Sequence, residues 1–244
     1  MKTAIITGCN RGFGLTLLKI FAQNEYNIIA CTRNKNDDFF KLCLKLEEDE
    51  GVKIHNIYFD SLKQEEIVKG MEDISTLNVD IDVLINNAAI CIIKPQMFTE
   101  YEEVENSFKI NYFAPFLITK MISDLMIRQG KGSIINISSI GSLGHQPGGA
   151  SYDASKAALN QFTVSIAQEL APFNVRMNAI APGPMQTEMF ENMKVDVKKK
   201  LLKTTALKRA ATMEEVTEVV LFLASDKASY ITGQIIRVDG GSII

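Results

Sequence analysis

Short apolar runs alternate with longer stretches of helical periodicity along the whole chain. Several runs are apolar at nearly every position, for example Ala4-Ile5-Ile6 and Val83-Leu84-Ile85. Continuous apolar character is typical of strands that are covered on both faces of a parallel sheet. The pattern predicts strands at residues 2–7, 27–33, 52–60, 81–86, 133–138, 175–180 and 234–238.

The stretches between these strands carry apolar residues at helical spacing. They predict helices at residues 12–24, 36–48, 64–75, 100–128, 152–170 and 213–224. Repeated strand–helix–strand order with right-handed crossovers gives an α/β fold, a doubly wound, seven-stranded parallel sheet. Neither a low-complexity linker nor a repeat divides the sequence, so residues 1–244 are expected to form a single domain.

A polar segment at residues 184–209 departs from this alternation and has a helical pattern of its own. An insertion beside the carboxyl edge of a sheet often acts as a substrate lid, and a passive surface excursion is the alternative. The segment is also basic. A basic lid suits an anionic substrate, whereas the other interpretation is a solvated helix face. Its cations are Lys194, Lys198, Lys199, Lys200, Lys203, Lys208 and Arg209.

Composition narrows the classes of function. The net charge of −3 argues against a general affinity for nucleic acid or anionic lipid. The four cysteines form no C-x-x-C pair and there are two histidines, which disfavours a metal site or a disulfide framework. The sequence shows neither a secretory signal nor an apolar stretch approaching the roughly 20 residues of a membrane span. A cytoplasmic protein is therefore expected.

Glycines cluster where the first predicted strand meets the first helix. The segment from Thr7 to Gly14 contains Gly8, Gly12 and Gly14. Such glycines permit a tight turn and let the backbone approach a pyrophosphate at a helix N-terminus. A glycine-rich connection without a ligand is the alternative, but the position between strand and helix favours dinucleotide binding. The candidate cofactor contacts here are Gly8, Asn10, Arg11, Gly12, Phe13 and Gly14.

The end of the second predicted strand bears on the choice of dinucleotide. NAD-binding folds normally have an acid there that binds the ribose 2′-hydroxyl, and this chain has Thr32 and Arg33. Arg33, with Arg11 nearby, can pair with a 2′-phosphate, unless both are solvated surface charges. NADP(H) is favoured and NAD(H) remains possible. Asp60 could accept a hydrogen bond from the adenine amino group, or it is a turn residue.

Tyr152 and Lys156 stand four residues apart, on one face of a predicted helix. The pKa of a free tyrosine is about 10, and a neighbouring ammonium is expected to lower it, making the phenol a general acid or base. Ser139 ends the fifth strand, where its hydroxyl can stabilise charge on a carbonyl oxygen. Asn111 lies in a long helical segment, where it either interrupts the helix and holds a water near the lysine or faces solvent.

With these motifs in this order, the sequence resembles the classical short-chain dehydrogenases/reductases over essentially its whole length. It looks most like their 3-oxoacyl-acyl-carrier-protein reductases, although similar C-terminal segments occur in relatives with sugar, steroid or polyol substrates. The matching elements are the glycine loop, Asn86-Asn87-Ala88, Ser139, Tyr152, Lys156, Pro182-Gly183, Thr187 and Val238-Asp239-Gly240-Gly241.

The resemblance implies a Rossmann fold and a hydride transfer between NADP(H) and a carbonyl or alcohol substrate. Tyr152 would protonate the carbonyl oxygen, which Ser139 would orient. Lys156 would depress the tyrosine pKa and hold the nicotinamide ribose, and Asn111 would anchor a proton-relay water. Family members are usually homotetramers or homodimers. The further cofactor contacts that the resemblance implies are Asn87, Ala88, Pro182, Gly183 and Thr187, with Tyr152 and Lys156.

Two positions depart from the family pattern. Ala89 stands where the family has glycine, and its methyl would crowd the cofactor only if the residue needs a positive φ. Phe13 replaces a smaller aliphatic residue. Two other classes remain open, a non-catalytic NADP-binding regulator and a nucleotide-sugar-modifying enzyme. His145, in the loop after Ser139, either touches substrate or is a solvent-exposed loop residue.

Overall fold

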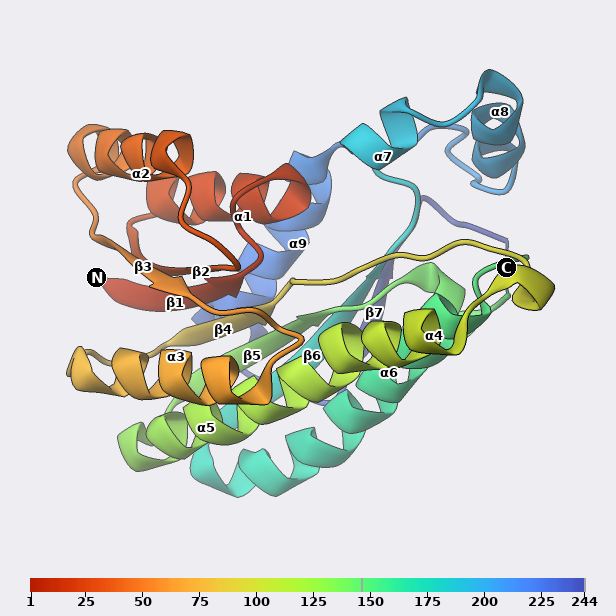
Figure 1. The fold of residues 1–244 in the computed structure, drawn as a ribbon. Helices are drawn as coiled ribbons and strands as arrows, with labels where there is room; N and C mark the ends of the chain where they lie inside the picture. Colours follow the sequence, from red (N-terminus) through yellow and green to blue (C-terminus); the bar gives the residue numbers. More distant parts are fainter. Residues whose placement is uncertain (146, 244) are drawn as a thin grey trace.

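Seven parallel strands form one sheet in the order β3-β2-β1-β4-β5-β6-β7 (Figure 1). The computed structural model describes residues 1–145 and 147–243. The doubly wound parallel sheet is confirmed, and each strand end lies within two residues of its predicted position. The strands are β1 (Lys2–Thr7), β2 (Tyr26–Thr32), β3 (Ile54–Tyr58), β4 (Val83–Asn86), β5 (Gly132–Ile137), β6 (Val175–Pro182) and β7 (Ile235–Val238).

Helices cover both faces of this sheet (Figure 1). One apolar core lies beneath α1 (Gly12–Gln23), α2 (Asp37–Glu50) and α9 (Met213–Ala224). The other lies beneath α3 (Gln64–Thr76), α5 (Ala114–Gln129) and α6 (Ala150–Leu170). Within the described residues, no helix is both long enough and apolar enough to cross a membrane.

Successive residues of a strand enter opposite cores, as the apolar runs require. Ile6 belongs to the core beneath α1, and Ile5 belongs to the core beneath α3. Ile135 and Ile134 of β5 divide in the same way. Because side chains alternate between the two faces, the centre of such a strand is apolar at successive positions and fills both cores.

The helix predicted at residues 100–128 is interrupted. It consists of α4 (Tyr101–Phe108), a π-helical turn (Lys109–Phe113) and α5. Asn111 lies in the π turn and is fully buried, so the interrupted helix is confirmed and the solvent-facing alternative is wrong. Such turns widen a helix locally and occur frequently at functional sites.

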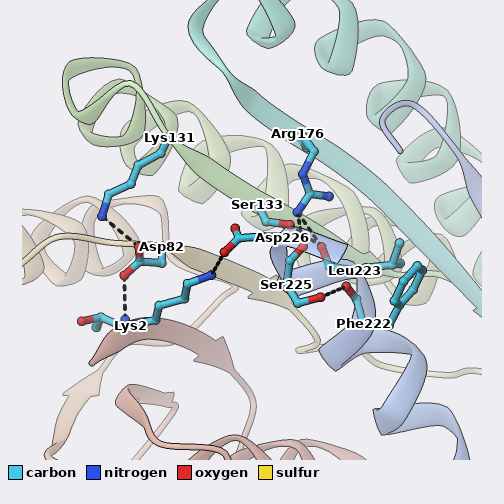
Figure 2. A network of polar contacts seen from close by, with 10 residues as sticks. Lys2, Asp82, Lys131, Ser133, Arg176, Phe222, Leu223, Ser225 and Asp226 are labelled. Atoms are coloured by element: carbon cyan, nitrogen blue, oxygen red, sulfur yellow. Dashed lines mark hydrogen bonds and ion pairs between the residues drawn. The ribbon is translucent and has the colours of Figure 1, made fainter. Parts of the chain in front are cut away.

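A network of hydrogen bonds and ion pairs stabilises the edge of the sheet where the parallel strands begin (Figure 2). Lys2 forms an ion pair with Asp226 at 2.9 Å, and Lys131 forms one with Asp82 at 3.1 Å. The Arg176 guanidinium donates to the carbonyl oxygens of Leu223 (2.8 Å) and Ser225 (3.2 Å). These oxygens lie at the C-terminal end of α9, where a cation is favourable.

The insertion at residues 184–209 forms two short helices, α7 (Glu188–Glu191) and α8 (Val195–Lys203), which stand apart from the sheet (Figure 1). Its two ends are joined, since Ala211 N–H donates to the Pro184 carbonyl and Gln186 N–H to the Ala211 carbonyl, both at 2.9 Å. Backbone hydrogen bonds therefore hold together the two ends of the segment where it leaves the sheet.

Candidate active site

The glycine loop between β1 and α1 packs tightly against the segment that follows β4. Gly8 has φ +66°, and a Cβ there would lie 2.9 Å from Ala88 Cα. A Cβ on Gly14 would lie 2.1 Å from the Gly8 carbonyl oxygen. Only hydrogen fits at these two positions, so the glycines are required by the conformation of the loop itself.

Asn87 holds this loop in place. Its Nδ2 donates to the carbonyl oxygens of Thr7 (2.9 Å) and Gly8 (3.2 Å). The backbone N–H groups of Asn87 and Ala88 both donate to Thr7 Oγ1 at 3.0 Å. Ala89 is exposed and is not among the described residues with a positive φ, so its methyl introduces no backbone strain.

The first turn of α1 fits the pyrophosphate of a dinucleotide. Arg11 is the N-cap residue, and no described side chain accepts a hydrogen bond from the amides of this turn. Gly12 has φ +53° and open space where a Cβ would lie. The amides of this turn and the positive end of the helix dipole favour an anion at the start of α1. Phe13 points away into the core, which accommodates its larger ring.

The end of β2 carries the residues that were expected to select the dinucleotide. Thr32 is buried at the end of β2 and donates to the Asn34 carbonyl at 3.3 Å. Arg33 and Arg11 are exposed. Asp60 Oδ1 accepts from Leu62 N–H at 3.0 Å, so the residue lies in a turn, and its contact with the adenine remains a prediction.

Ser139, Tyr152 and Lys156 come together at the carboxyl end of β5. Ser139 Oγ accepts from Gly141 N–H at 3.2 Å, and its hydroxyl acts to lower the pKa of the Tyr152 phenol. Lys156 lies one turn further along α6, with its Nζ 6.0 Å from the centre of the Tyr152 ring. The lysine is almost fully buried, and its Nζ donates to the Ile137 carbonyl at 2.7 Å.

The electrostatics differ from the sequence expectation. Burial raises the pKa of Tyr152, proximity to Cys91 raises it further, and the hydrogen bond with Ser139 opposes this. The expected lowering by the ammonium is therefore wrong for this structure. Burial also lowers the pKa of Lys156 to about 8. At neutral pH the phenol thus carries its proton, as a general acid must.

Asn111 connects the π turn to two other segments of the site. Its Oδ1 accepts from Ile90 N–H, and its Nδ2 donates to the Ile90 carbonyl and to Ser155 Oγ, all at 2.9 Å. Ser155 Oγ in turn donates to the Tyr152 carbonyl at 2.7 Å. Asn111 therefore fixes the loop after β4 relative to the helix that carries Tyr152. The water that Asn111 was expected to hold remains a prediction.

The remaining predicted residues lie at the end of β6. Gly183 N–H donates to the Val238 carbonyl at 3.0 Å, and a Cβ on Gly183 would lie 2.7 Å from Asp239 Cα. Pro182 ends β6, and Thr187 caps α7 by accepting from Phe190 N–H at 3.3 Å. His145 is exposed in its loop, and its contact with substrate remains a prediction.

Two residues of this site were missed from the sequence. Cys91 interacts electrostatically with both Tyr152 and Lys156, and burial raises its pKa to about 11. Ser155 joins Asn111 to Tyr152. The position of Cys91, just beyond the end of β4, was the available signal, because β4 and β5 are neighbours in the sheet.

Comparison with known proteins agrees with this geometry. The family described as Enoyl-(Acyl carrier protein) reductase matches residues 8–242. The chain is 37% identical over 240 residues to a 3-oxoacyl-(acyl-carrier-protein) reductase of Aquifex aeolicus, covering 98% of this chain and 96% of that protein. It is 35% identical over 243 residues to a cyclopentanol dehydrogenase of Comamonas sp., with coverage of 98% and 96%.

A solved structure shows the same likeness in three dimensions. A 3-oxoacyl-(acyl-carrier-protein) reductase of Brucella melitensis, with bound NAD, superposes with a TM-score of 0.90. The two sequences are 26% identical, and the match covers 100% of this chain and 91% of that chain.

Proposed function

The chain belongs to the short-chain dehydrogenase/reductase family, and we propose that it moves a hydride between NADP(H) and a carbonyl or secondary-alcohol substrate, with Tyr152 as the general acid/base. It is an oxidoreductase that acts on CH–OH or C=O groups with a nicotinamide cofactor. The observation that carries the proposal is that Ser139, Tyr152 and buried Lys156 come together at the carboxyl end of β5, with Lys156 Nζ 6.0 Å from the centre of the Tyr152 ring.

Each side chain has a role in this proposal. The bound nicotinamide supplies or accepts the hydride. Ser139 donates a hydrogen bond to the substrate oxygen and stabilises the negative charge that develops on it. Tyr152 delivers its proton to the same oxygen during reduction, and the Lys156 ammonium stabilises the resulting phenolate. Asn111 keeps the tyrosine helix in position.

The preference for NADP(H) rests on exposed Arg33 and Arg11 and on the absence of an acid at the end of β2. A planar guanidinium can form two hydrogen bonds with a phosphate. We therefore expect Arg33→Ala to raise the KM for NADPH about 10- to 100-fold, which corresponds to the loss of one or two charge-assisted hydrogen bonds. The KM for NADH should stay unchanged, and both are measured from the absorbance of the reduced nicotinamide.

The same assay tests the proposed function itself. Wild-type protein is offered NADPH or NADH with 3-oxoacyl thioesters, cyclopentanone, ketosugars, quinones and simple ketones. Turnover of at least one carbonyl compound with NADPH supports the proposal. A strong preference for NADH would reject the assignment of Arg33. Tight NADPH binding without turnover of any substrate would favour the non-catalytic regulator.

We propose that residues 184–209 act as the substrate lid. Three of the seven cations in this segment already have partners. Lys198 pairs with Glu191 at 3.0 Å, Arg209 pairs with Glu215 at 2.6 Å, and Lys208 donates to the Lys203 carbonyl at 2.8 Å. The cations left for an anionic substrate are Lys194, Lys199, Lys200 and Lys203.

We further propose that two copies of the chain associate through α4 and α5. Large apolar side chains are exposed there, with Tyr101 78% and Phe113 55% accessible. They border a hollow of about 260 Å³ that also contains Phe108. Exposed apolar patches of this kind mark interaction surfaces. Sedimentation velocity should show a dimer or tetramer, and Tyr101→Glu should shift it toward monomer. A wild-type monomer at micromolar concentration would reject this association.

A further inference from the structure

Ser142, three positions along the chain, forms hydrogen bonds with the backbone of Ser139. The Ser139 carbonyl oxygen accepts a hydrogen bond from Ser142 N–H at 3.1 Å and a second, short one from Ser142 Oγ. Ser142 Oγ also lies 3.1 Å from Ser138 Oγ. The hydroxyl of Ser142 thus lies at the centre of the turn that carries the candidate catalytic serine.

A third group fixes Ser142 from the opposite side. Asn160 Nδ2 donates to Ser142 Oγ at 2.7 Å. Asn160 belongs to α6 and is only 7% exposed, so water competes little for this hydrogen bond. Along α6, Tyr152, Lys156 and Asn160 follow one another at intervals of four residues, and such residues share one helical face.

The same helix therefore contacts both hydroxyl-bearing candidates of the site. It carries Tyr152 directly, and it orients Ser139 through Asn160 and Ser142. We propose that Ser142 and Asn160 are positioning residues, which set the direction of the Ser139 hydroxyl relative to the Tyr152 phenol. This inference rests on the proposed function, because it assumes that Ser139 acts on the substrate oxygen.

Two substitutions separate this role from a general loss of stability. Ser142→Ala removes the hydroxyl. Asn160→Leu removes a single described hydrogen bond, since Asn160 Oδ1 has no hydrogen-bond partner among the described residues and Leu has a similar volume. Ser142→Thr keeps the hydroxyl and serves as the conservative variant.

We expect Ser142→Ala and Asn160→Leu each to lower kcat about 10- to 100-fold, because a small misplacement of a catalytic group has effects of this order. The KM for NADPH should not change, because the glycine loop lies between β1 and α1, whereas Ser142 and Asn160 lie after β5 and in α6. Ser142→Thr should restore most of kcat. In the double variant the kcat losses should not multiply, because both substitutions break one chain of contacts.

Ser133→Ala is the matched control. Ser133 lies at the other end of β5 and donates to the Leu223 carbonyl at 2.9 Å (Figure 2). Its loss should lower the melting temperature and leave kcat unchanged. The same set includes Ser139→Ala. If Ser139→Ala keeps full turnover, the proposed function of Ser139 fails.

If Ser139→Ala abolishes turnover and Ser142→Ala does not lower it, the positioning role alone is overturned. Multiplying effects in the double variant, or no rescue by Ser142→Thr, would also overturn it.

Discussion

Tyr152→Phe is expected to lower kcat about 1,000-fold or more, within the range that general acid–base catalysis contributes. The substitution removes the phenolic oxygen, and with it the transferable proton and the group whose pKa Ser139 influences. The ring remains in place beside Lys156, so the packing of α6 is preserved. NADPH binding should therefore survive, as measured by the change in nicotinamide fluorescence on titration.

Tyr26→Phe provides the control for this substitution. Tyr26 is 7% exposed at the start of β2 and packs against Phe21, away from the three candidate catalytic side chains. We expect Tyr26→Phe to keep wild-type kcat. If Tyr152→Phe keeps it as well, then the tyrosine is not the general acid, and the hydride-transfer mechanism proposed for this site would have to be abandoned.

The fold was predictable because a strand that is buried on both faces has adjacent apolar residues in the sequence. Ile5 and Ile6 are adjacent, and both are fully buried in different cores, so the centre of the strand is apolar at successive positions. The interruption of the long helix was predictable for a similar local reason. Asn111 is a poor helix former, and the structure uses its amide to bind the backbone of Ile90.

The pKa of Tyr152 was not predictable in the same way. Spacing places Lys156 on the same helical face as the tyrosine, but it contains no information about how deeply either side chain is buried. Burial raises the pKa of the phenol and lowers the pKa of the ammonium, because low polarity disfavours each charged form. Spacing alone therefore brought the two residues together but gave the wrong direction for the shift in the tyrosine pKa.

Contacts between distant segments could not be predicted from the sequence either. Asn160 reaches Ser142 across 18 positions of the chain, and Asn111 reaches Ser155 across 44. Neither pair shares a helix or a strand, so periodicity cannot connect them. The partners of the cations in residues 184–209 could not be predicted from the sequence either. The sequence shows seven positive charges, and only the structure shows that Lys198, Lys208 and Arg209 have partners.

The glycine loop packs closely against its neighbours at Gly14. A Cβ on Gly14 would meet three groups at once. It would lie 2.1 Å from the Gly8 carbonyl oxygen, 2.6 Å from Asn87 Nδ2 and 2.9 Å from Cys9 Cα. Two of these atoms are backbone, and Asn87 Nδ2 is itself bound to the Thr7 and Gly8 carbonyls, so none can move without shifting the loop.

Gly14→Ala displaces the loop and is therefore expected to weaken NADPH binding about 10- to 100-fold. This corresponds to a loss of about 1.4 to 2.8 kcal/mol of binding free energy. The Kd is measured by fluorescence titration, with circular dichroism to establish that the variant is folded. Gly51→Ala is the control, because a Cβ on Gly51, which follows α2, would meet no atom within 4 Å, although the φ of Gly51 is positive (+68°). It should lower stability by about 1 kcal/mol and leave the Kd unchanged. An unchanged Kd in folded Gly14→Ala would show that the cofactor does not depend on this loop.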